Sequence, residues 1–263
     1  MKHYKDKVAV ITGAGSGIGR ALARQLALSG CHLALSDVNA QGLEETVALM
    51  DKGDIRLVHH RVDVTDRAAV KAYAAELESE FGAIDLLFNN AGIAGKHAPM
   101  QDYEYSDFEK VLDVNLWGTI CCTKEMLPLL LRAGEPQLVN FSSILGLVAV
   151  ARNGAYTASK FAVRGYTEAL QLEFADSHLQ VSCVHPGFIA TNIAVAANAS
   201  AEMIETFKIR GMSPDHCARI ILKSVAKRRR RIVVTPLAHA LDYLQRVAPS
   251  GYRRIAAPIL SNH

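Results

Sequence analysis

Short apolar runs alternate with longer amphipathic segments along most of the chain. The strand-like runs cover residues 8–12, 32–37, 55–62, 85–89, 138–141, 180–184 and 232–234. The helical patterns between them cover residues 21–29, 40–50, 67–81, 106–131, 155–175 and 214–227. Short strands that are mostly apolar and separated by helices are typical of a parallel sheet covered on both faces. The pattern predicts one α/β domain, built on a doubly wound sheet of seven parallel strands with helices on both faces.

The composition narrows the class of protein. Half of the 263 residues are apolar, which is enough for a sizeable core, and the net charge of +3 is too small to indicate a nucleic-acid partner. The basic run at 227–231 directly precedes an apolar strand, so we interpret it as a solvated helix end rather than a binding patch. The ten histidines lack metal-ligand spacing, and we assign no metal site.

The cysteines and the apolar segments indicate a cytoplasmic location. The five cysteines form no Cys-x-x-Cys motif and are odd in number, which favours a reducing compartment over a disulfide framework. The first residues, MKHYKDKVAVITG, carry too many charges for a signal peptide. No stretch approaches the roughly 20 apolar residues that a membrane span needs.

A glycine-rich loop directly follows the first strand. The segment TGAGSGIG has Gly13, Gly17 and Gly19 in a G-x-x-x-G-x-G spacing, with Ser16 and Ile18 between them, and it opens a helix. Glycines let the backbone approach a diphosphate, and the helix N-terminus supplies free N–H groups and a positive dipole end. The alternative is a tight strand-to-helix turn that needs glycine for its conformation alone.

Asp37 ends the second strand, eighteen residues after Gly19. An acidic residue there would bind the ribose hydroxyls of adenosine. A 2′-phosphate would face this carboxylate, and Ser16 offers no compensating cation, so NAD is favoured over NADP. The alternative role for Asp37 is a helix N-cap before Asn39.

Tyr156 lies four residues before Lys160 in a segment with a helical pattern. Four residues are about one helical turn, so the phenol and the ammonium would share one face. A phenol has a pKa near 10, and lowering that pKa toward 7 requires about 4 kcal/mol of preferential stabilisation of the phenolate. The pair is either a chance exposed pair or a phenol prepared to lose its proton.

Several further motifs occur in a consistent order and spacing along the chain. They are Asp63-Val64 after the third strand, NNAG at 89–92, Asn115 within DVNLWG, Ser143 as the second serine of NFSS, and PGFIAT at 186–191. Together with the glycine loop and Tyr-x-x-x-Lys they cover about residues 7–192. In this combination the chain resembles the short-chain dehydrogenase/reductase family, in its compact single-domain branch with a Rossmann-type fold.

The resemblance implies four catalytic residues. Tyr156 would be the general acid/base, and Lys160 would lower its pKa and hold the nicotinamide ribose. Ser143 would orient the substrate oxygen, although a serine at a strand end can simply satisfy local backbone. Asn115 would kink its helix through a bound water and join a proton relay, the alternative being a polar contact between helices.

The resemblance also assigns cofactor and substrate contacts. The cofactor residues would be Gly13, Ser16, Gly17, Ile18, Gly19, Asp37, Asp63, Val64, Asn89, Ala91, Gly92, Tyr156, Lys160, Pro186, Gly187, Ile189 and Thr191. The substrate would meet Ser143, Leu145 and Tyr156. Residues 192–211 would form a lid, and the apolar residues around the pocket favour an uncharged alcohol or ketone.

The last segment departs from many relatives. Leu237, Ala240, Leu241, Leu244 and Val247 recur at helical spacing, which predicts an amphipathic helix. We therefore divide the chain into a catalytic domain, 1–235, and a tail, 236–263, packed on the domain or on a partner subunit. Alternatively, the tail would cover the substrate site or lie on a membrane surface.

The sequence thus predicts an NAD-dependent oxidoreductase that interconverts a small to medium, apolar secondary alcohol and its ketone. The alternatives are an NADPH-preferring carbonyl reductase, a silent NAD-binding scaffold, and an epimerase or dehydratase on the same fold. By resemblance, subunits would pair through the helices at 106–131 and 155–175, giving a homodimer or homotetramer.

Overall fold

A single parallel sheet organises the molecule. The computed structural model describes residues 2–51, 53–191, 193, 205, 209, 211–252 and 254. The strands, in the spatial order β3-β2-β1-β4-β5-β6-β7, all pair in parallel. They are β1 (Val8–Thr12), β2 (His32–Asp37), β3 (Leu57–Arg61), β4 (Leu86–Asn89), β5 (Gln137–Phe141), β6 (Gln180–His185) and β7 (Arg231–Val233). The predicted fold class is confirmed, with β3 shorter than expected.

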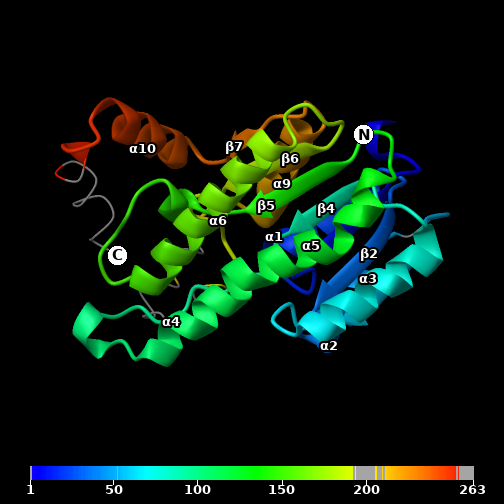
Figure 1. Cartoon of the computed structure of the whole chain (residues 1–263), viewed down its shortest axis with the longest axis horizontal. Coiled ribbons are helices and arrows are strands. Elements are labelled where there is room, and N and C mark those ends of the chain that lie inside the picture. The colour runs from blue at the N-terminus through cyan, green and yellow to red at the C-terminus, as the bar shows by residue number, and fades with distance from the viewer. Residues whose placement is uncertain are drawn as a thin grey trace.

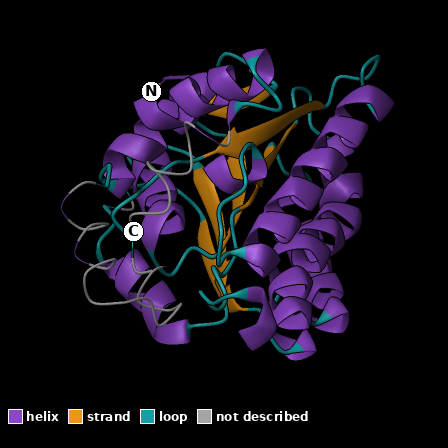
Figure 2. Ribbon diagram, turned by 90° about the vertical axis from the view of Figure 1, so that its left-hand side faces the viewer, coloured by secondary structure: helices purple, strands orange, loops and turns teal. Residues whose placement is uncertain are grey.

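Helices cover both faces of the sheet (Figures 1 and 2). They are α1 (Gly17–Ala27), α2 (Ala40–Ala48), α3 (Arg67–Phe81), α4 (Tyr105–Leu112), α5 (Gly118–Leu131), α6 (Gly154–Glu173), α9 (Pro214–Val225) and α10 (Pro236–Val247). Side chains alternate along β1: Ala9 and Ile11 join the core under α1 and α9, whereas Val10 joins the core under α3 and α5. Burial on both faces explains why the strand sequences are nearly all apolar.

The connections place the carboxyl ends of the central strands at one edge. The chain runs outward from β1 through β2 to β3, and then returns to β4 on the other side of β1. This reversal opens a crevice beyond the ends of β1 and β4, where ligands bind in open parallel sheets. The segments following Thr12, Asp37, Asn89 and Phe141 therefore meet at one place.

The helix predicted at 106–131 is continuous but not regular. A π-helical turn, Asp113–Trp117, joins α4 to α5. Turns of this kind are rare within helices and frequent at functional sites. Asn115 lies at the middle of this turn and is fully buried.

The predicted C-terminal helix forms as α10 and packs on its own domain. Ala238 and Leu241 are buried in a third core cluster with Ile144, Val148 and Tyr252. The Thr235 hydroxyl caps the helix by accepting from the Ala238 N–H at 3.2 Å, and Asp242 forms an ion pair with Arg231 of β7.

The buried face of α10 differs from the predicted one, because Ala240 and Val247 are exposed. Most of the predicted lid, 192–211, and the end of the tail lie outside the described residues.

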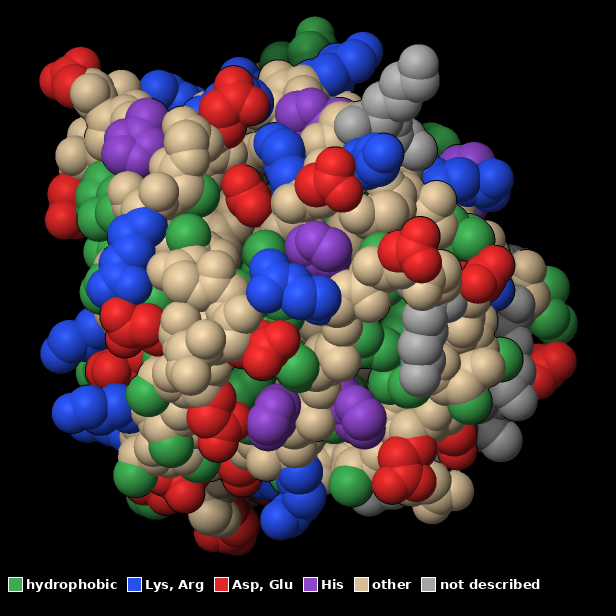
Figure 3. Space-filling view, turned by 90° about the vertical axis from the view of Figure 1, so that its right-hand side faces the viewer, with side chains coloured by type: hydrophobic (Ala, Val, Ile, Leu, Met, Phe, Trp, Pro, Cys, Tyr) green, Lys and Arg blue, Asp and Glu red, His purple; other side chains and the backbone are tan. Residues whose placement is uncertain are grey.

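Figure 3 shows one side of the molecule, on which basic and acidic side chains are interspersed. This face offers no continuous positive surface, in keeping with the small net charge.

Candidate active site

A cavity of about 600 Å³ lies at the carboxyl edge of the sheet. This volume is typical of sites for small molecules and cofactors. Seventeen of the twenty predicted site residues line it: Gly13, Ser16, Gly17, Ile18, Asp37, Asp63, Val64, Ala91, Gly92, Ser143, Leu145, Tyr156, Lys160, Pro186, Gly187, Ile189 and Thr191. The other three, Gly19, Asn89 and Asn115, are not part of the cavity wall.

The glycine loop leaves the start of α1 open to the cavity. Gly13 and Gly17 have φ values of 66° and 52°, in the left-handed region that favours glycine. Ser16 occupies the N-cap position of α1, but its side chain makes no capping hydrogen bond. The first N–H groups of an eleven-residue helix are therefore available to an anion, which fits the diphosphate of a dinucleotide.

Asn90 and Gly19 fix the conformation of this loop. The Asn90 side chain donates to the backbone oxygens of Thr12 and Gly13, at 3.0 and 3.1 Å. A Cβ atom at Gly19 would lie 2.2 Å from the Gly13 oxygen. Gly19 thus allows the close packing of loop on helix instead of facing the cavity.

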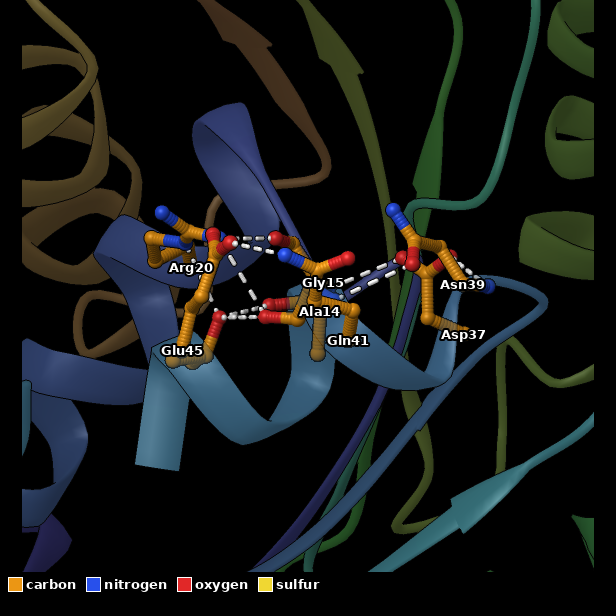
Figure 4. Close-up of polar contacts among 9 residues, drawn as sticks. Ala14, Gly15, Arg20, Asp37, Asn39, Gln41 and Glu45 are labelled. Carbon is orange, nitrogen blue, oxygen red and sulfur yellow. Dashed lines mark hydrogen bonds and ion pairs between the residues drawn. The ribbon is translucent and has the colours of Figure 1, made fainter. Parts of the chain in front are cut away.

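Asp37 lines the cavity and also fixes the loop (Figure 4). Its Oδ2 accepts from the Gly15 N–H at 2.8 Å, and its Oδ1 accepts from the Asn39 N–H at 2.9 Å. A carboxylate offers about four acceptor sites, so each oxygen retains capacity for a ribose hydroxyl. The alternative role as helix cap is wrong, because Asn39 is the N-cap of α2 and accepts from the Gly42 N–H at 3.1 Å.

Figure 4 also shows the cation nearest to the loop. The Arg20 guanidinium pairs with Glu45 at 2.8 Å and donates to the backbone oxygens of Gly15 and Gly42. These contacts hold α1, α2 and the loop together, so the Arg20 guanidinium is already engaged in structural interactions.

The α6 helix brings the phenol of Tyr156 and the ammonium of Lys160 to the same wall. Lys160 Nζ lies 5.7 Å from the centre of the Tyr156 ring and donates to the Phe141 oxygen at 2.9 Å. Only 4% of Lys160 is exposed, and burial lowers its pKa to about 8. The ammonium is therefore costly to keep charged, which is a feature of groups positioned for function.

Ser143 meets Tyr156 across the cavity. Burial raises the pKa of the Tyr156 phenol above its ordinary value, and a hydrogen bond with the Ser143 hydroxyl opposes this rise. The Ser143 oxygen itself accepts from the Leu145 N–H at 3.1 Å, which fixes its direction. Burial alone thus keeps the phenol protonated, and phenolate formation needs further positive charge nearby.

Asn115 supports the site from behind. Its Oδ1 accepts from the Ile93 N–H at 2.8 Å, while its Nδ2 donates to the Ile93 oxygen and to Ser159 Oγ, both at 2.9 Å. The side chain therefore ties the loop after β4 to α6. A Cβ atom at Gly92 would lie 3.0 Å from Asn115 Oδ1 and 3.3 Å from Lys160 Nζ, so a larger residue would require these side chains to shift.

Asn89 belongs to a buried network rather than to the cavity. Its Nδ2 donates to Thr123 Oγ1 and to Asn140 Oδ1, both at 2.9 Å. The two asparagines of the NNAG motif thus have different roles: Asn89 links β4 to α5, and Asn90 holds the glycine loop.

Several cavity residues were not predicted from the sequence. They include His97, Lys110, Val114 and Asn153, while Asn90 and Phe188 lie in predicted motifs but were not assigned a site role themselves. His97 lies in a loop without periodicity, and Asn153 reads in sequence as an ordinary helix cap. Among the described residues, no group of three or more His, Cys, Asp and Glu side chains could hold a metal ion, and no helix is long and apolar enough to cross a membrane.

Comparison with known proteins identifies the family. A family model described as short chain dehydrogenase matches residues 7–202. The chain is 43% identical to the Mycobacterium tuberculosis protein SadH, over 98% of this chain and 96% of that protein. It is 34% identical to cyclohexanol dehydrogenase from Acinetobacter sp. strain SE19 (83% and 87% covered), and 36% identical to levodione reductase from Leifsonia aquatica (72% and 71%). The chain belongs to the short-chain dehydrogenase/reductase family.

Solved structures agree with this assignment. A short-chain dehydrogenase/reductase from Burkholderia phymatum in complex with NAD matches with a TM-score of 0.86 and 30% identity, covering 94% of this chain and 95% of that one. An alcohol dehydrogenase from Thermococcus sibiricus complexed with 5-hydroxy-NADP matches with a TM-score of 0.76 and 25% identity, covering 88% and 96%. Both kinds of dinucleotide therefore occur among similar structures.

The buried ammonium predicts a pH-dependent stability. The folded-state pKa of Lys160 is about 8, below its ordinary 10.5, so the unfolded chain binds this proton more tightly. Its contribution to the free energy of unfolding therefore rises with pH between 8 and 10.5. We expect Lys160→Met to gain stability relative to the native chain near pH 7, and this gain to shrink by about 1–3 kcal/mol toward pH 10.

Urea unfolding of both chains at pH 7 and pH 10 measures the difference. Lys223→Met, which removes an exposed lysine of α9, is the matched control and should show no such pH dependence. A gain from Lys160→Met that is equal at the two pH values would contradict the prediction.

Proposed function

We propose that this protein is an NAD-dependent oxidoreductase that interconverts a secondary alcohol and its ketone. One observation carries the proposal: Ser143, Tyr156 and Lys160 line the same cavity as the glycine loop and Asp37. The shared cavity supports proton transfer and dinucleotide binding at one site. The dinucleotide, when bound, supplies the carbon that takes or gives the hydride.

Each side chain has a separate proposed role in the reaction. The substrate oxygen would lie between the Ser143 hydroxyl, which donates a hydrogen bond to it, and the Tyr156 phenol, which accepts or returns the proton. Lys160 would stabilise the phenolate by its charge and would hold the nicotinamide ribose of a bound dinucleotide. Asn115 positions α6 through Ser159 and stands beside Lys160 for the relay of the proton to solvent.

The walls around Ser143 favour an apolar ring or chain on the substrate. Ile93, Ala94, Ile144, Leu145 and Phe188 line this part of the cavity. The relatives named for cyclohexanol and levodione support a cyclic secondary alcohol or ketone of similar size. The third core cluster, which includes α10, packs behind this wall through Ile144, Leu145 and Phe188.

Replacing the phenol tests the proposed chemistry. Tyr156→Phe should lower kcat for oxidation of cyclohexanol by about 10²–10⁴-fold, because the proton acceptor is lost. Binding of NADH, followed by calorimetry, should stay within a few-fold. Tyr105→Phe removes an exposed hydroxyl of α4 and is the control.

A native rate in Tyr156→Phe would refute the acid/base role. Tight NADH binding without turnover of any secondary alcohol or ketone would instead support the silent scaffold.

The choice of NAD over NADP rests on Asp37. Its carboxylate would face a 2′-phosphate, and the nearby Arg20 is already paired with Glu45. We expect NADH to bind more tightly than NADPH, and Asp37→Asn to weaken NADH binding about tenfold through loss of charge-assisted hydrogen bonds. NADPH binding should weaken less or improve.

Calorimetric titration with both dinucleotides provides the measurement. Glu44→Gln removes an exposed carboxylate of α2 outside the cavity and should leave both affinities unchanged. Tighter binding of NADPH than NADH by the native chain would refute the assignment and favour the reductase alternative.

The outer face of α6 supports the proposed homodimer or homotetramer. Phe161 and Leu172 lie eleven residues apart, which is three turns of one helix face, and they are 38% and 78% exposed. Trp117, in the π turn, and Leu131, at the end of α5, are also exposed. The helix α10 packs elsewhere, against Ile144 and Val148, so it does not cover α6.

Light scattering should give a mass two or four times that of one chain. Leu172→Glu should lower that mass, because a charge in an apolar interface is costly. Tyr243→Glu, at an exposed position of α10, should not. A monomeric native chain would refute the proposal.

We also propose a cytoplasmic location and a small-molecule substrate as the partner. The five described cysteines are free and buried, which supports a reducing cytoplasm as the proposed compartment. A small-molecule substrate is the partner that the enclosed cavity supports.

A further inference from the structure

An asparagine at the start of the catalytic helix does not cap it. Asn153 occupies the N-cap position of α6, yet its side chain makes no capping hydrogen bond. Asparagine at this position normally accepts from the first turn of the helix. Instead, Asn153 Nδ2 lies 3.2 Å from the Ala151 oxygen and 3.2 Å from His97 Nδ1, and both Asn153 and His97 line the cavity.

The contacts of Asn153 determine the hydrogen-bonding roles of this pair. A backbone oxygen can only accept, so the Asn153 atom facing the Ala151 oxygen is the amide nitrogen. Its second N–H then points to His97 Nδ1, which must accept, and the neutral imidazole carries its proton on Nε2. The pair is left with one donor, His97 Nε2–H, and one acceptor, Asn153 Oδ1. Neither atom has a hydrogen-bond partner among the described residues.

The backbone holds the pair in place. The Ala98 N–H donates to the Arg152 oxygen at 3.0 Å, and the Tyr103 hydroxyl donates to the oxygens of Lys96 and Arg152. Arg152 has a φ of 63°, a conformation that costs a residue other than glycine about 1 kcal/mol or more. Such strain is maintained where a surrounding structure needs it, and here it turns the chain so that Asn153 faces His97.

The pair lies close to the catalytic phenol. Asn153 precedes Tyr156 by three residues, a rise of about 4.5 Å along α6. Much of the wall around Ser143 is apolar, with Ile93, Ile144 and Phe188. A donor and an acceptor therefore line the same cavity as the phenol, at the start of the helix that carries it.

We propose that His97 and Asn153 bind a second hydroxyl group of the substrate. A hydroxyl can accept from His97 Nε2–H and donate to Asn153 Oδ1 at once. A methyl group would leave both atoms unpaired, a ketone would leave Asn153 Oδ1 unpaired, and a carboxylate would face that oxygen with like charge. The substrate class is then a diol, or the corresponding hydroxyketone. This inference rests on the proposed function.

Two alcohols of similar size test it: cyclohexane-1,4-diol and 4-methylcyclohexanol, each oxidised with NAD. We expect the native enzyme to favour the diol by about tenfold or more in kcat/KM. His97→Leu and Asn153→Leu should each lower the ratio of kcat/KM for the diol to kcat/KM for 4-methylcyclohexanol by about tenfold. His97→Gln, which keeps an N–H donor at similar reach, should retain the native ratio.

The comparison of the two substrates separates a binding role from a structural one. Thermal unfolding of each variant checks that it folds, and a structural defect would lower both rates together. Equal loss for both alcohols, or no native preference for the diol, overturns the inference while the proposed function stands. A preference for 4-hydroxycyclohexanecarboxylate over the diol overturns the hydroxyl assignment. If the native enzyme oxidises none of these alcohols with either dinucleotide, the proposed function and this inference fail together.

Discussion

The burial of an ammonium group beside a phenol is the constraint on which this site depends. Lys160 is almost fully buried, and its ammonium donates to the Phe141 oxygen at the end of β5. Burial lowers the pKa of Lys160 and raises that of Tyr156, so it disfavours the charged form of each group, which is the form that catalysis would use. Only a rigid framework can maintain such an arrangement, and the surrounding contacts supply it: Asn115 links α6 to the loop after β4, and Gly92 makes room where that loop crosses Lys160.

The sheet and its connections bring the two halves of the site together. The reversal between β1 and β4 opens the crevice, and the glycine loop with Asp37 forms one end of it. The cavity wall around Ser143 is supported by α10, which forms a core cluster with Ile144 and Val148. A Cβ atom at Gly187 would lie 2.1 Å from Thr235 Oγ1, the cap of α10, so this tail also packs against the segment after β6. The C-terminal helix is thus part of the scaffold of the cavity.

Much of the fold could be predicted from the sequence, because strands buried on both faces need apolar residues nearly throughout and the helices between them need one apolar face. The glycine loop, Asp37 and Tyr156 were found because each motif reflects a local backbone or helix spacing. The resemblance implied a kink at Asn115, but the contacts that accompany the π turn there, with Ile93 and Ser159, could not be predicted because these residues are distant in sequence. The pairing of His97 with Asn153 depends in the same way on a tertiary contact, and it diverts a residue that its sequence position marks as a helix cap. Gly19 and Asn89 were placed in the right motifs, but the structure gives them packing and hydrogen-bonding roles outside the cavity.

Burial alone favours the protonated phenol of Tyr156, and we propose that positive charge from Lys160 and an oxidised nicotinamide makes it a usable base. An ultraviolet pH titration of the phenolate, taken as the difference between the native chain and Tyr156→Phe, measures this directly. Without a dinucleotide, the Tyr156 pKa should lie above the ordinary value of about 10. With saturating oxidised NAD it should fall by several units toward neutrality, and the fall should be smaller in Lys160→Met. A pKa of Tyr156 that is unchanged by oxidised NAD would contradict the account.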